Sequence, residues 1–76
     1  MRTIEFPIFT TEDRAIRPPY VIIADFGVEE GIYIFGSART LEKAQEYFEY
    51  YKTNETTLEQ AKRLEIVKAV WVENPF

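Results

Sequence analysis

The chain of 76 residues carries 13 acidic and 9 basic side chains, a formal net charge of −4, and neither cysteine nor histidine. This composition excludes disulfides, thiolate or imidazole metal sites, and the histidine that most often serves as a general base. It also disfavours direct nucleic-acid binding, which needs a basic stripe along the phosphates. We therefore expect no metal and no cofactor.

Size and hydropathy predict a single small domain over residues 1–76. Apolar residues make up 46% of the chain, but no apolar run reaches the roughly 18 residues that a membrane span requires. Residues 1–5 also lack the apolar region of a signal peptide. These features predict a cytoplasmic protein with no membrane association. A core this small would gain stability from self-association or a partner.

The N-terminal residues predict an edge strand followed by a loop. Residues 1–9 alternate apolar and polar side chains, and Pro7 indicates an edge because proline cannot donate a hydrogen bond to a neighbouring strand. Residues 10–19 are mainly polar and end in two prolines. We interpret them as a loop with a helical turn near residues 12–16.

A hairpin is predicted next. Residues 20–26 and 32–37 are rich in β-branched and aromatic side chains, and Gly27 and Gly31 bound the segment between them. Two such runs joined by a glycine-bounded loop are typical of paired antiparallel strands. Gly36, at the end of the second run, indicates a β-bulge.

The main helix is predicted over residues 41–52, with Thr40 as its N-cap. One apolar stripe of this helix consists of Leu41, Ala44, Phe48 and Tyr51. Tyr50 lies opposite the stripe, on the outer surface. Residues 53–55 are expected to break the helix.

The C-terminal part predicts a short helix and a strand. Thr57 with Gln60, or Thr56 with Glu59, makes a capping box for a helix over residues 58–63. Residues 65–72 predict the last strand, although the helix could instead continue to Lys68. Residues 74–76 are expected to be a frayed terminus.

These elements predict a small α+β domain in the order β-β-β-α-α-β. Its mixed sheet has three or four strands, and a right-handed crossover places the main helix on one face. Residues 20–26, 32–35 and 64–72 do not alternate cleanly between apolar and polar. Both faces of the sheet therefore need cover, from the N-terminal segment, a second subunit or a partner protein.

No set of residues predicts catalysis. The pairs Glu12-Asp13 and Glu29-Glu30 fall in predicted loops, where carboxylates are ordinarily solvated. Asp25 interrupts an apolar strand close to a turn, and such a carboxylate more often caps loop amides or pairs with an arginine than acts as a base. The glycines match no phosphate-binding loop. We expect a protein that is not an enzyme.

The strongest functional signal is the aromatic content of 16%. Exposed tyrosine and tryptophan are enriched at interface hot spots. Strand alternation predicts that Tyr33 and Phe35 share a face, and we expect Trp71 on the same exposed surface. The candidate protein-interface residues are Tyr33, Phe35, Glu46, Tyr47, Glu49, Tyr50 and Trp71. Because its glutamates are negatively charged, the helix could also bind the basic groove of a nucleic-acid enzyme, in place of nucleic acid.

In size, acidity and lack of catalytic residues, the chain resembles small orphan proteins of phages and other mobile elements. That resemblance implies a single mixed αβ domain that binds and blocks a host enzyme or defence complex. We therefore predict a non-catalytic protein-binding module, most simply a phage-type inhibitor of a host protein. The alternative is a structural homodimer that buries the second sheet face against its twin.

Overall fold

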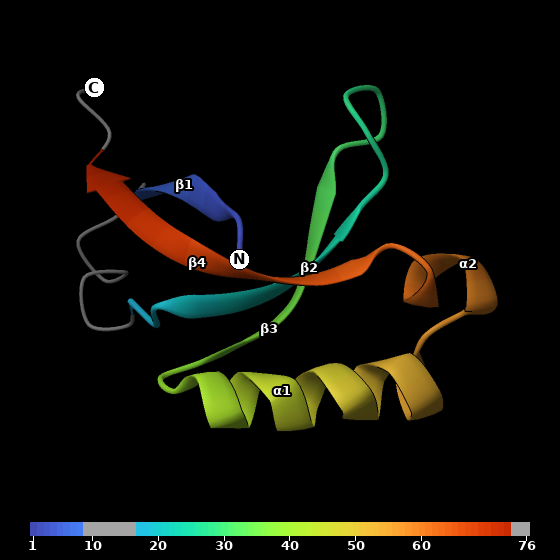
Figure 1. Ribbon diagram of the computed structural model, residues 1–76. Helices are drawn as coiled ribbons and strands as arrows, with labels where there is room; N and C mark the ends of the chain where they lie inside the picture. The colour runs from blue at the N-terminus through green and yellow to red at the C-terminus, as the bar shows by residue number, and fades with distance from the viewer. Residues whose placement is uncertain (9–16, 74–76) are drawn as a thin grey trace.

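The computed structural model (Figure 1) describes residues 1–8 and 17–73, which form a four-stranded mixed sheet and its helices. The elements are β1 (Thr3–Ile8), β2 (Tyr20–Asp25), β3 (Ile32–Ala38), α1 (Leu41–Tyr50), η2 (Tyr51–Glu55), α2 (Leu58–Ala61) and β4 (Leu64–Glu73). This arrangement confirms the predicted α+β class and element order. The turn predicted near residues 12–16 and the terminus 74–76 lie outside the described residues.

The spatial order of the strands is β1-β4-β2-β3, so the last strand of the chain lies inside the sheet. β1 pairs with β4 in parallel, and Pro7 lies opposite Val72. β2 runs antiparallel to β4. The predicted edge position of the N-terminal strand is therefore confirmed. The alternative in which the second helix continues to Lys68 is wrong, since β4 already begins at Leu64.

The predicted hairpin joins β2 and β3. Gly27 and Gly31 have φ angles of 93° and 85°, values that glycine adopts without steric cost. The pairing shifts between Ile22, which opposes Gly36, and Ile23, which opposes Ile34. A bulge therefore lies beside Gly36, as predicted, although β3 continues past it.

The main helix begins as predicted but ends later. The Thr40 side chain accepts a hydrogen bond from the backbone N–H of Lys43 at 3.2 Å, which satisfies one of the free N–H groups of the first turn. The predicted break at residues 53–55 is wrong. A π-helical turn, η2, carries the helix through Glu55, and the Thr53 hydroxyl donates to the Glu49 carbonyl at 2.8 Å.

The predicted second helix forms over a shorter span. The capping box uses Thr57 and Gln60, each side chain accepting from the other residue's backbone N–H. Its helix, α2, ends at Ala61 rather than Arg63. Since four residues make a single turn, α2 acts as a connector to β4.

α1 covers one face of the sheet beside β2 and β3 (Figure 1). Ala44 is the buried residue of α1, and Ile22 and Ala24 of β2 are also fully buried. An added Cβ at Gly36 would lie 3.1 Å from the Tyr51 ring. Glycine there lets the end of the helical segment approach the bulge closely.

The other sheet face has a second cluster of buried side chains. It consists of Phe6, Val21, Ile23, Val67 and Ala69, with Ile4 and Trp71 packed against it. β1 supplies Ile4 and Phe6, so the N-terminal segment provides part of the cover that the sequence called for. Both faces of the central strands are thus buried, while β1 lies on the far side of β4 from α1 (Figure 1).

Candidate protein-binding surface

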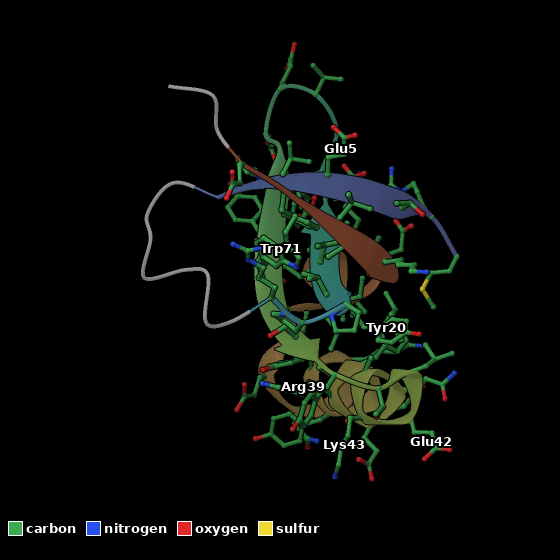
Figure 2. All side chains as sticks on the ribbon, turned by 90° about the vertical axis from the view of Figure 1, so that its left-hand side faces the viewer. Glu5, Tyr20, Arg39, Glu42, Lys43 and Trp71 are labelled. Atoms are coloured by element: carbon green, nitrogen blue, oxygen red, sulfur yellow. The ribbon has the colours of Figure 1, made fainter. Side chains whose placement is uncertain are left out.

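Trp71 belongs to the core cluster rather than to an exposed surface. Its ring centroid lies 5.3 Å from that of Phe6, and its indole N–H donates to the Pro18 carbonyl at 3.0 Å. Figure 2 shows it among the strands of the sheet. Tyr33 lies directly opposite Ala24, so both side chains point to the sheet face that α1 covers. Trp71 packs on the opposite face, with the core cluster. The expectation that Trp71 shares a surface with Tyr33 is therefore wrong.

Phe35 is partly buried at the bulge and contacts the helical segment. Its ring meets Tyr51 edge to face, with centroids 5.8 Å apart. Tyr51 in turn meets Tyr50 in the same manner at 5.7 Å. We call these three residues the aromatic strip. It connects β3 to the outer side of α1, and it includes the predicted residues Phe35 and Tyr50.

The outer side of α1 carries the predicted tyrosines and glutamates. Tyr47 and Tyr50 are exposed, and Glu46 forms an ion pair with Lys43 at 3.1 Å. The Tyr50 hydroxyl donates to Glu55 at 2.8 Å, and this hydrogen bond raises the pKa of Tyr50. Figure 2 shows Glu42 and Lys43 pointing away from the sheet. Glu49 is exposed as well.

Among the described side chains of the sheet, the largest apolar exposure lies on β3. Ile32, Tyr33 and Ile34 are 42%, 52% and 58% exposed. Within the described part of the chain β3 pairs only with β2, so its second side is an open sheet edge. Residues Ile32–Ala38 include no charged residue and no proline. Sequence reasoning included Tyr33 but missed both isoleucines, although an uncharged run at the end of a hairpin was the available signal.

The opposite edge of the same sheet has a different character. β1 presents Glu5 and Pro7, both exposed, and proline and charged side chains oppose the addition of another strand. Val70 and Val72 of β4 lie beside them and are 41% and 40% exposed. β3 is therefore the edge that lacks protective residues.

Asp25 is held in a structural network. Its carboxylate pairs with Arg2 at 2.9 Å and accepts the backbone N–H of Gly27 at 2.9 Å. Arg2 also pairs with Glu65 at 2.8 Å. The Gly27 N–H and then Arg2 lower the pKa of Asp25. The structure thus places Asp25 as the sequence predicted, capping a loop amide and pairing with an arginine.

No protein-family model, no curated protein and no solved structure matches the chain. Across residues 1–8 and 17–73, acidic side chains nowhere gather in a group of three that could hold a metal ion. In the same residues no helix has the length and apolar character to cross a membrane. The exposed edge of β3 and the aromatic strip beside it are therefore the candidate functional surface.

Proposed function

We propose that this protein is a non-catalytic protein-binding module that docks an extended segment of a partner on β3. The observation that carries the proposal is the run of three exposed apolar residues, Ile32, Tyr33 and Ile34, on an uncharged sheet edge. An open edge presents unpaired backbone N–H and C=O groups. These groups bind an added strand, while side chains of alternate residues supply specificity.

The aromatic strip extends this docking surface toward α1. Edge-to-face contacts hold Phe35, Tyr51 and Tyr50 against one another, and Glu55 fixes the Tyr50 hydroxyl. Side chains that are already ordered lose less conformational entropy on binding. Tyrosines in such positions are typical of interface hot spots. A partner that pairs with β3 could therefore also contact Tyr50.

The narrower form of this proposal is a phage-type inhibitor of a host enzyme or defence complex. Its support is the class resemblance together with the outer side of α1, where Glu42, Glu46 and Glu49 are exposed beside Tyr47. Such a surface complements a basic groove. The homodimer remains the alternative, and it requires the partner to be a second copy.

Quantitative affinity capture tests the proposal. Tagged wild-type protein, Ile34→Lys and Leu58→Lys serve as baits, with captured proteins identified by mass spectrometry. Leu58 is 75% exposed on α2, so its substitution is a matched change away from β3. We expect a partner that binds wild type and Leu58→Lys but is lost from Ile34→Lys.

The captured partner is then purified and titrated with each bait. Affinity that falls at least tenfold with Ile34→Lys alone would support docking on β3, because lysine on an edge strand opposes pairing. Equal affinity for all three baits would remove β3 from the proposal. Circular dichroism of each bait establishes that the variants fold.

A further inference from the structure

We infer that the strand which docks on β3 is β3 of a second copy of this chain, paired antiparallel about a two-fold axis. This inference rests on the proposed function, in which the β3 edge binds a strand, and it identifies the partner. The two sheets would then form one continuous sheet across two chains. Three observations support it: the direction of the backbone groups, the distribution of the side chains, and the charges at the two ends of β3.

The first observation concerns the backbone groups. Phe26 donates its N–H to the Gly31 carbonyl at 3.0 Å, which closes the hairpin. Along an antiparallel pair, successive residues direct their N–H and C=O groups alternately toward the partner strand and away from it. Counting from this pair, Tyr33 directs its backbone toward β2. Ile32 and Ile34 therefore direct theirs toward the open edge.

The second observation concerns self-complementarity. A two-fold axis through Tyr33 places Ile32 of each copy opposite Ile34 of the other, and each of these pairs can exchange both N–H···O bonds. The isoleucines of both copies then form one apolar cluster on one sheet face. The two Tyr33 rings meet on the other face. The bulge beside Gly36 limits the pairing to this short segment.

The third observation concerns charge. Glu29 and Glu30 lie in the turn before β3, and Arg39 follows its last residue. Figure 2 shows Arg39 where β3 passes into α1. Antiparallel pairing brings each Arg39 beside the acidic turn of the other copy. A parallel arrangement would instead place the acidic turns together, so the charges select the antiparallel dimer.

Glu29, Glu30 and Arg39 form no ion pair among residues 1–8 and 17–73. All three are exposed. The net charge of −4 on each copy opposes association, but the local pairing at both ends of β3 is attractive. We expect a reversible dimer, since the paired segment is short.

Sedimentation equilibrium of the full chain from about 1 µM to 1 mM tests the inference. Wild type and Leu58→Lys should dimerise equally. Ile34→Lys should raise the dimer dissociation constant on the order of a hundredfold, because each dimer loses two apolar contacts and gains two lysines on the paired edge. A wild-type chain that stays monomeric throughout this range would overturn the inference.

Charge reversal identifies the orientation. Arg39→Glu should raise the dissociation constant about tenfold, and adding Glu30→Arg to that variant should restore most of the affinity. A dimer that neither Ile34→Lys nor charge reversal weakens uses another surface, and that result would also overturn the inference.

The dimer and the docking of a different partner on β3 can be refuted independently. A monomeric wild type that still captures a different protein through Ile34 keeps the proposed function and overturns only the dimer. A monomer that binds no protein through β3 overturns both. Thermal unfolding of each variant by circular dichroism separates loss of pairing from loss of fold.

Discussion

Replacing Trp71 with phenylalanine tests whether this residue supports the core, as the structure indicates, or a partner surface. The substitution removes the hydrogen bond from the indole N–H to Pro18, which is 3.0 Å long, and a net hydrogen bond is worth about 0.5–1.5 kcal/mol. It also removes part of the ring surface that packs on Phe6, worth about 1 kcal/mol at roughly 25 cal/mol per Å². We expect the free energy of unfolding to fall by about 2 kcal/mol.

That loss is large for so small a chain. At about 0.05–0.15 kcal/mol per residue, a domain of this length has a total stability of roughly 4–11 kcal/mol. The corresponding fall in Tm is roughly 8–16 °C. Urea unfolding and thermal unfolding followed by circular dichroism measure both quantities, and binding is measured on the same samples below the Tm.

Tyr33→Phe is the control for this measurement. Tyr33 is 52% exposed, so removal of its hydroxyl should change the free energy of unfolding by less than about 0.5 kcal/mol. If Trp71→Phe were equally stable but lost its partner, the assignment of Trp71 to the core would be refuted.

Three further substitutions test other parts of the fold. Asp25 has its pKa lowered below 3.8 in the folded state by the Gly27 N–H and Arg2; its stabilising contribution is therefore present above about pH 4 and lost as the pH falls through the folded pKa. Arg2→Ala should lower the Tm at pH 7 and make the fall below pH 4 shallower, and parallel Tm–pH curves would contradict this role. Gly27→Ala should cost about 1–2 kcal/mol in urea unfolding, because Gly27 has a φ of 93°; Gly27→Asn should cost less, and equal costs would argue against backbone strain. Thr57→Ala should cost about 0.5–2 kcal/mol by loss of the N-cap, whereas Thr57→Ser should be nearly neutral, and an equal loss in both would exclude the capping hydrogen bond as the cause.

Local signals in the sequence predicted most of the elements. The cap at Thr40, the capping box at Thr57 and the hairpin glycines each depend on contacts between residues close in sequence. Such contacts can be inferred from spacing alone. The continuation through η2 was missed because the spacing rule for an α-helix does not anticipate a π-helical turn.

The relative placement of strands was not predictable in the same way. Alternation assigns Tyr33 and Phe35 to one face of a single strand, but it cannot relate that face to the face of Trp71 on another strand. That relation depends on the register between β2, β3 and β4. The bulge adds a second difficulty, because it shifts the pairing of β3 partway along the strand.

The position of the exposed apolar surface determines what kind of partner it suits. The sequence indicated apolar side chains on both faces of the sheet, which would call for a second layer packed face to face. In the structure the central strands are already buried on both faces, with Ile22 and Ile23 fully enclosed on opposite sides. The exposed apolar surface instead lies at the β3 edge, where Ile34 is 58% exposed. An edge adds strands, not layers. A partner of this protein should therefore extend the sheet sideways, and β3 of a second copy meets that requirement with matching side chains and charges.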